Sequence, residues 1–297
     1  MQSKVLRSAW MSIAIATSSL AFGPRAHAQD GDGEIEYVGR SNPYKVDPVT
    51  DISIISLALA FGAFSQIVLD SGEIVPQQPQ DPSRLNSFDQ FTVRQADPWA
   101  GPISDWAVFA MLGWAVADPI AAGVRDGAGP GVDLGVMYAE TLALAWAAAN
   151  TAKLIVRRPR PRAYQEQKRL IDLYGKENAP NISETDYGVS FFSGHTAMAA
   201  AVSSTASYHA FVRDPDHARP WITLGVGSTL TTLVAIQRVR SGAHFPSDVV
   251  AGALAGVGIG LLVPHLHRET KADTASAITA PQPLRGRGPQ LSWSGAF

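Results

Sequence analysis

Long apolar stretches alternate with short polar segments along most of this chain. The apolar stretches run for 17 to 25 residues and are rich in Ala, Leu, Val and Gly, which is typical of helices rather than strands. They cover residues 52–69, 103–123, 132–156, 193–212, 221–239 and 247–263. A shorter amphipathic helix is expected at 86–95, and strand signals are weak throughout. The pattern predicts an all-α protein, a bundle of about six main helices.

Polar segments divide the chain into four expected parts. Residues 1–28 resemble a secretory signal peptide, with Lys4 and Arg7 before a short apolar run and Ala-His-Ala at 26–28. Residues 29–50 form a Gly-, Asp- and Pro-rich leader, and 51–268 form the helical domain. Residues 269–297 form a polar tail that we expect to be disordered. Inside the domain, residues 163–189 read as a polar loop that follows the run R-R-P-R-P-R.

Composition narrows the classes of protein. Hydrophobic residues make up 46% of the chain and charged residues 17%, which favours a heavily buried helical protein or a membrane protein. The net charge of -2 gives no basic field for nucleic acid, and the absence of cysteine excludes thiol catalysis and thiolate metal sites. Asp105, Asp118 and Glu140 interrupt the apolar stretches and would be costly facing lipid, so membrane spans and core helices both stay open.

Location follows only partly from these features. The signal-like start predicts an exported protein, either periplasmic or membrane-associated, with its site on the extracytoplasmic side. Three apolar stretches precede residue 157, however. If all three spanned a membrane after a cleaved signal peptide, residue 157 would lie in the cytoplasm. Either the apolar stretches are core helices of an exported soluble protein, or one of them does not span.

Chemistry concentrates in three short motifs. The first is Lys153 followed by Arg160-Pro161, with six residues between the lysine and the arginine. The second is Ser193-Gly194-His195, at the start of a predicted helix. The third reads Q-R-V-R-S-G-A-H-F-P-S-D and contains Arg238, His244 and Asp248. Cations, a helix start and two histidines are the groups needed to bind an anion and transfer it.

Together the motifs resemble the superfamily of type 2 phosphatidic acid phosphatases, bacterial non-specific acid phosphatases and vanadium-dependent haloperoxidases. That family carries K-x6-R-P, then P-S-G-H, then S-R-x5-H-x3-D, and this chain has the three in the same order with their internal spacings kept. Two positions depart from the pattern. Phe192 stands where the family has proline and Gln237 where it has serine, which bears on substrate preference more than on reaction class.

The resemblance and the chemistry of phosphoryl transfer assign a role to each motif. Lys153, Arg160 and Arg238 would balance the charge on the phosphoryl oxygens, and Ser193 and Gly194 would bind the anion at a helix N-terminus. His244 would be the nucleophile and form a phosphohistidine, with Asp248 accepting the N–H of its far nitrogen.

The second motif histidine completes the predicted site, because His195 would act as general acid and then as base for water. The other basic and histidine side chains receive lesser roles. Arg158 is an additional candidate for a substrate contact, whereas the neighbouring arginines are expected in a solvated basic loop. Four histidines outside the motifs are expected at the surface or at helix ends: His209, His217, His265 and His267.

The sequence therefore predicts a metal-independent phosphatase that hydrolyses phosphomonoesters, with lipid phosphates and lipid pyrophosphates among the candidate substrates. We expect no cofactor and no metal, because no zinc, calcium or nucleotide motif is present. Two alternatives stay open. A vanadium-dependent haloperoxidase would use the same residues to bind vanadate, and a catalytically silent envelope protein would keep only the fold. The sequence does not indicate an oligomeric state.

Overall fold

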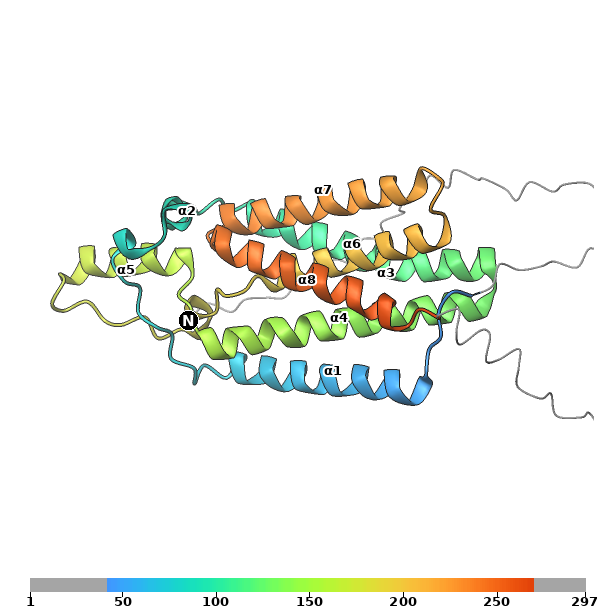
Figure 1. Cartoon of the computed structure of the whole chain (residues 1–297). Coiled ribbons are helices and arrows are strands. Elements are labelled where there is room, and N and C mark those ends of the chain that lie inside the picture. Colours follow the sequence, from blue (N-terminus) through green and yellow to red (C-terminus); the bar gives the residue numbers. More distant parts are fainter. Residues whose placement is uncertain (1–41, 270–297) are drawn as a thin grey trace, which may run out of the picture. The chain divides into compact units, whose positions relative to one another are not determined.

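The computed structural model describes residues 42–269, and this part of the chain is helical (Figure 1). Its only extended pairing is an isolated antiparallel bridge between Tyr44 and Arg268, at the two ends of the described segment. Six helices have 20 residues or more, and they confirm the predicted all-α bundle. These are α1 (Pro48–Asp70), α3 (Ala100–Asp126), α4 (Ala128–Val156), α6 (Gly194–Arg213), α7 (Arg219–Arg240) and α8 (Pro246–Leu266).

Shorter helices lie in the segments between the long ones. The amphipathic helix expected at 86–95 is present as α2 (Ser87–Gln90) followed by a 3-10 turn at Phe91–Arg94. The polar loop expected at 163–189 is wrong in its first part, because α5 occupies Pro161–Tyr174. Proline at its first position and charge pairs one turn apart, such as Lys168 with Asp172, stabilise this helix without an apolar stretch.

Helix α6 is the centre of the bundle and packs against α3, α4, α7 and α8, whereas α1 packs on the outside of α4. Successive long helices run in opposite directions (Figure 1). As a result α1, α4 and α7 end where α3, α6 and α8 begin, and α2 and α5 lie at this same end. The first and last described residues lie at the opposite end. Ends of helices that are far apart in the sequence therefore lie together at this end of the bundle.

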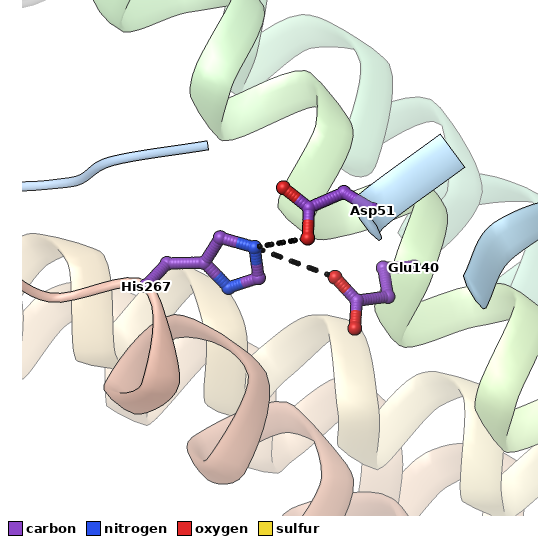
Figure 2. Close-up of side chains that lie close together, drawn as sticks. All are labelled: Asp51, Glu140 and His267. Atoms are coloured by element: carbon purple, nitrogen blue, oxygen red, sulfur yellow. Dashed lines mark ion pairs between the residues drawn. The ribbon is translucent and has the colours of Figure 1, made fainter. Parts of the chain in front are cut away.

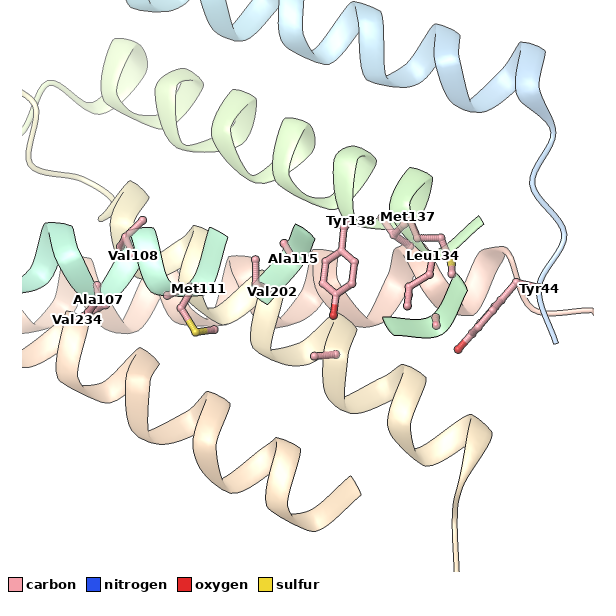
Figure 3. Close-up of a cluster of buried hydrophobic side chains, with 14 residues drawn as sticks. Tyr44, Ala107, Val108, Met111, Ala115, Leu134, Met137, Tyr138, Val202 and Val234 are labelled. Atoms are coloured by element: carbon pink, nitrogen blue, oxygen red, sulfur yellow. The ribbon is translucent and has the colours of Figure 1, made fainter. Parts of the chain in front are cut away.

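The largest core cluster lies mainly between α3, α4 and α6, with Val234 of α7 and Val263 of α8 at its edges (Figure 3). Met111, Leu134, Met137 and Val202 are almost completely buried there. Tyr138 is buried as well, and its hydroxyl donates to Asp118 Oδ2 at 3.0 Å. One acidic residue that the sequence placed in an apolar stretch is thus paired inside the protein rather than left facing lipid.

Helices α6 and α8 approach closely along a row of glycines. Gly252, Gly256 and Gly260 occur every fourth residue on α8 and face the backbone of α6. A Cβ atom built at Gly256 would lie 2.1 Å from the carbonyl oxygen of Ala197, a distance that no side chain tolerates. Small residues at such spacing let two helix backbones touch, as they do in many membrane bundles. This contact fixes the start of α6 against the start of α8.

Five helices are long and apolar enough to cross a membrane, namely α1, α3, α4, α7 and α8, with α5 continuing the segment of α4. Large apolar side chains such as Phe64, Phe109 and Leu254 project outward from them and are well exposed. An outer surface of this kind indicates membrane association. Because α1, α3 and α4 precede the first motif, a spanning topology puts Asn42 and that motif on opposite faces of the membrane.

Candidate active site

The three motifs meet at the end of the bundle where α4 and α7 end and α6 and α8 begin. Lys153 lies in the last turn of α4, and Arg238 lies in the last turn of α7. Ser193 is the N-cap of α6. His244 lies in the turn before α8, and its backbone N–H donates to the carbonyl of Arg238 at 3.2 Å. Side chains that lie up to 91 positions apart in the sequence, from Lys153 to His244, are thus brought together at one end of the bundle.

Three cations face one another at this end. Lys153, Arg160 and Arg238 lie close enough that each is subject to repulsion from at least one of the other two. Among the described residues, the Lys153 ammonium has no carboxylate at ion-pair distance. The Nε atoms of Arg160 and Arg238 are buried and lack a hydrogen-bond acceptor within the described part of the chain. Positive charge and unused donors in one place indicate a binding site for an anion.

The N-terminus of α6 completes the anion site. Ser193 caps the helix by accepting a hydrogen bond from the backbone N–H of Thr196, at 3.4 Å. A Cβ atom at Gly194 would lie 3.8 Å from Lys153 Nζ, so this helix start and the ammonium are in direct contact range. Free N–H groups of a helix start point toward this space and favour negative charge. The predicted cradle of Ser193, Gly194 and Lys153 is therefore physically consistent.

His244 is fully enclosed and its tautomer follows from its contacts. Its Nδ1 lies 2.6 Å from the carbonyl oxygen of Ser190, and a carbonyl only accepts, so Nδ1 carries the proton. The lone pair is then on Nε2. Burial lowers the pKa of His244 well below its ordinary value, and the charges of Arg238, Arg160 and Lys153 lower it further. The imidazole is neutral at physiological pH, as a nucleophile must be.

Asp248 does not contact the ring of His244, and this part of the sequence-based prediction is wrong. Its Oδ2 accepts from the backbone N–H of Phe245 at 2.8 Å and from the hydroxyl of Ser190. Its backbone carbonyl accepts from Ser193 N at 3.1 Å. Because Asp248 is the third residue of α8, its side chain reaches back to cap that helix. The carboxylate thus acts on His244 indirectly, by holding Ser190.

A buried salt-bridge network holds the carboxylate of Asp248 in place. Arg158 binds Asp248 through Nη1 and Asp89 through Nη2, at 2.5 and 2.8 Å, and neither carboxylate has an exposed side-chain surface. Ser247 donates its backbone N–H to Asp89 at 3.0 Å. Burial raises the pKa of Asp89, but hydrogen bonds from Ser247 and Arg158 outweigh it and lower that pKa. Both ends of the Arg158 guanidinium are therefore occupied by carboxylates that position α8, so this arginine is not a substrate contact.

The carboxylate partner expected for His244 is found on the other histidine instead. Asp105, near the start of α3, places Oδ1 3.0 Å from His195 Nε2 and 3.4 Å from Arg238 Nη1. A carboxylate only accepts, so His195 carries a proton on Nε2 and leaves Nδ1 for other chemistry. Sequence reasoning missed this role for Asp105. The signal was present, since an acidic residue inside an apolar stretch marks a functional site more often than a structural one.

Two adjoining cavities lead away from the cations. One of about 100 Å³ is lined by charged and polar groups that include Lys153, Arg160 and Asp186. The other, of about 270 Å³, is lined by Lys153, Gly194 and His195 at one end and by Trp146 and Met198 further along. Trp146 precedes Lys153 by seven residues on α4, which corresponds to about 10 Å along the helix. The site thus joins a polar end to a partly apolar chamber.

Both departures from the family pattern are buried beside the site. Phe192 packs against Ala149 and Ala197, between α4 and α6. Gln237 is almost fully buried, and its Oε1 has no hydrogen-bond donor among the described residues. Neither side chain displaces a cation or a histidine of the motifs. Both therefore affect the packing around the site rather than its reactive groups.

One histidine outside the motifs differs from expectation. His209 lies inside α6 with an exposed fraction of only 3%, whereas His267 is at a helix end as expected, at the C-cap of α8, and is buried there. Within residues 42–269 the one trio of His, Asp or Glu side chains close enough to share a metal ion includes His267, with Asp51 and Glu140. It involves none of the motif residues.

Comparison with known proteins agrees with the motifs. Residues 134–272 match the profile of the PAP2 superfamily, a range that contains all three motifs. Among solved structures, the chain overlaps a transmembrane PAP2 type phosphatidylglycerolphosphate phosphatase from Bacillus subtilis with 18% identity and a TM-score of 0.43. The overlap covers 73% of this chain and 94% of that one, too loosely to carry an argument about function. No curated protein matches. The family that residues 134–272 match is therefore the PAP2 superfamily, in agreement with the resemblance that the three motifs carry.

Proposed function

We propose that this protein is a phosphatase that needs no metal for catalysis and cleaves phosphomonoesters through a phosphohistidine on His244. The match of residues 134–272 to the PAP2 superfamily supports a phosphatase at family level. The observation that carries the finer proposal is the convergence of three cations on a neutral, buried histidine. Cations supply the charge that a metal ion supplies in other phosphatases, and the histidine supplies the nucleophile.

In the first step, Nε2 of His244 attacks phosphorus while Lys153, Arg160 and Arg238 hold the phosphoryl oxygens. The bond from phosphorus to the ester oxygen breaks, and His195 protonates the leaving alcohol. Ser190 keeps the proton of His244 on Nδ1, so the lone pair stays aimed at the phosphoryl group. Asp105 stabilises the imidazolium form of His195 before the transfer.

The second step reverses the role of His195. Neutral after the first transfer, it takes a proton from water, and the resulting nucleophile attacks phosphorus of the phosphohistidine. The phosphorus–nitrogen bond breaks, phosphate leaves, and His244 and His195 return to their starting forms. Each proton given up in the first step is recovered in the second, so the cycle balances.

The substrate class that fits best is a lipid phosphate. The cavity of about 270 Å³ begins at Lys153 and His195 and continues beside Trp146 and Met198, at a depth where the outer surface of the bundle is apolar. A phosphate on the cations would leave an attached apolar chain room in this direction. A soluble phosphomonoester would fill only the polar end.

We further propose that the site faces the extracytoplasmic side. With α1, α3 and α4 as spans, Asn42 then lies in the cytoplasm. This topology excludes a cleaved signal peptide at residues 1–28, which lie outside the described residues, because cleavage would leave Asn42 on the extracytoplasmic side. A cleaved signal peptide and an extracytoplasmic site were both expected from the sequence. If α1, α3 and α4 span the membrane, only one of the two can hold.

The deciding experiment measures phosphate release by the purified full chain in mild detergent with EDTA, on an aryl phosphate and on phosphatidic acid. We expect release from both, faster from the lipid, and complete loss in His244→Ala. The matched control is His217→Ala, at an exposed histidine in the α6–α7 turn, which should keep full activity. Activity retained in His244→Ala would disprove the nucleophile, and activity that a folded, metal-free chain regains only with an added metal ion would disprove metal-independent catalysis.

A further inference from the structure

A second cluster of reactive side chains lies away from the active site, at the end of the bundle that holds the first and last described residues. Asp51 is in the first turn of α1, Glu140 is in the middle of α4, and His267 caps the end of α8. Glu140 precedes Lys153 by 13 residues, or about 20 Å along α4. All three side chains are at least nine-tenths buried, and Figure 2 shows them pointing at one another.

Each of the three residues turns a lone pair toward the same point. His267 Nδ1 lies 2.8 Å from the carbonyl oxygen of Val263, so Nδ1 carries the ring proton and Nε2 is free to act as a ligand. A ring fixed in this way by a backbone carbonyl is the usual arrangement for a metal-binding histidine. Asp51 uses Oδ2 to accept from Asp47 N at 2.8 Å and keeps Oδ1 for the cluster.

Glu140 provides an independent indication that something is bound. Its Oε2 is buried and accepts no hydrogen bond from residues 42–269, although a carboxylate oxygen out of water normally accepts one. It lies 3.5 Å from His267 Nε2, and Asp51 Oδ1 lies 3.2 Å from the same nitrogen. Two ligands of one tetrahedral zinc ion, at bonds of about 2.0 to 2.1 Å, are about 3.4 Å apart. The donor atoms, all within 4.8 Å of one another, are spaced for a shared ion.

Charge leads to the same conclusion. Among the described residues, no lysine or arginine forms an ion pair with Asp51 or Glu140. A proton on His267 would balance only one of the two carboxylates, whereas a divalent cation balances both and satisfies all three lone pairs. The imidazole selects a transition-metal ion over Mg²⁺ or Ca²⁺, which prefer oxygen ligands.

We propose that Asp51, Glu140 and His267 bind one divalent transition-metal ion of the zinc class, which ties α1, α4 and the end of α8 together. The ion has no part in phosphate chemistry, since its ligands lie about 20 Å from Lys153 along α4. Its role is to fasten α1, which otherwise packs only on the outside of the bundle. Solvent molecules complete its coordination shell.

The test is the metal content of the full chain, purified in detergent without chelator and with an affinity tag that lacks histidine. We expect about one transition-metal ion per chain by mass spectrometry, and thiolates cannot account for it because the chain has no cysteine. Prolonged chelation should lower the melting temperature by several degrees, and one equivalent of Zn²⁺ or Mn²⁺ should restore it.

Variants separate this site from other binding. Glu140→Gln should bind Zn²⁺ at least tenfold more weakly, whereas Glu166→Gln on α5 and His244→Ala at the active site should keep the ion. Folded wild-type protein that holds no metal, and whose melting temperature no divalent transition metal raises, would overturn the proposal. So would an ion that Glu140→Gln keeps with unchanged affinity. Neither readout depends on phosphatase activity.

Discussion

The contact between Asp105 and His195 allows a pH-resolved test of the acid–base step. Replacing Asp105 with asparagine keeps the size of the side chain and an oxygen that can accept a hydrogen bond, but removes the negative charge. That charge lies 3.0 Å from His195 Nε2 and favours the protonated imidazole. Without it, the pKa of His195 should fall, and less of the enzyme should carry the proton that the leaving alcohol needs.

The size of this effect follows from distance and exposure. The side chains of His195 and Asp105 are 33% and 48% exposed, so water screens their attraction strongly. With a dielectric constant near that of water, two unit charges at 3.0 Å interact by about 1.4 kcal/mol. This corresponds to about one pKa unit. At a pH where His195 is mostly neutral, Asp105→Asn should therefore lower kcat by about tenfold.

The assay is a pH profile of kcat on a soluble aryl phosphate at saturating substrate. Since the pKa of His195 falls, the decline of kcat toward high pH should begin about one unit lower in Asp105→Asn, and the two profiles should converge at acidic pH. Asp172→Asn, at an exposed pair on α5, should leave the profile unchanged. An equal loss of kcat at every pH would refute a role through His195. A rise in KM alone would indicate that Asp105 acts through Arg238.

Three further predictions concern stability and topology. Arg158→Met should lower the free energy of unfolding by about 3–5 kcal/mol in thermal melts, because it leaves two buried carboxylates unpaired; Arg158→Lys, which keeps one charge, should lose less. Gly256→Ala should cost at least about 1–3 kcal/mol through the clash with α6, whereas Gly258→Ala, with open space around it, should be neutral; equal melting temperatures would contradict the glycine contact. The chain has no native cysteine, so Lys176→Cys and Asp216→Cys can be labelled singly with an impermeant maleimide in intact cells. Only the first should react if the site is extracytoplasmic, and labelling of both would contradict a spanning bundle.

Sequence spacing predicted which residues meet, but not how they contact one another. The motifs placed Lys153, Ser193 and His244 at helix ends, and alternation of long helices brings those ends together. The exact partner of a carboxylate depends on side-chain direction within one turn, and for Asp248 the capping of α8 prevails over a contact with His244. Asp105 lies 90 residues from His195, so only the packing of α3 beside α6 could reveal that pair.

Amphipathic and buried polar features were the hardest to predict. Helix α5 lies at the end of the bundle and does not need an apolar stretch. Charge pairs within the helix, such as Arg169 with Glu166, stabilise it instead. His267 is at a helix end as expected, but its contacts could not be predicted, since its partners Asp51 and Glu140 lie on helices more than 120 positions away. Apolar periodicity reports which face of a helix is buried, but it carries no information about polar groups that pair across helices.

The central position of α6 has a consequence for how the protein is made. This helix is long enough to cross a membrane, yet it is absent from the candidate spans because Ser203, Ser204, Thr205 and Ser207 interrupt its apolar residues. Lipid would solvate these hydroxyls poorly, whereas inside the bundle they are buried, and the Thr205 hydroxyl donates to the carbonyl of Gly260 on α8 at 3.1 Å. If the bundle spans a membrane, α6 must therefore enter the bilayer together with its neighbours rather than alone. The anion cradle at its start then forms only once the bundle has assembled, so a chain that is inserted incompletely has no working site.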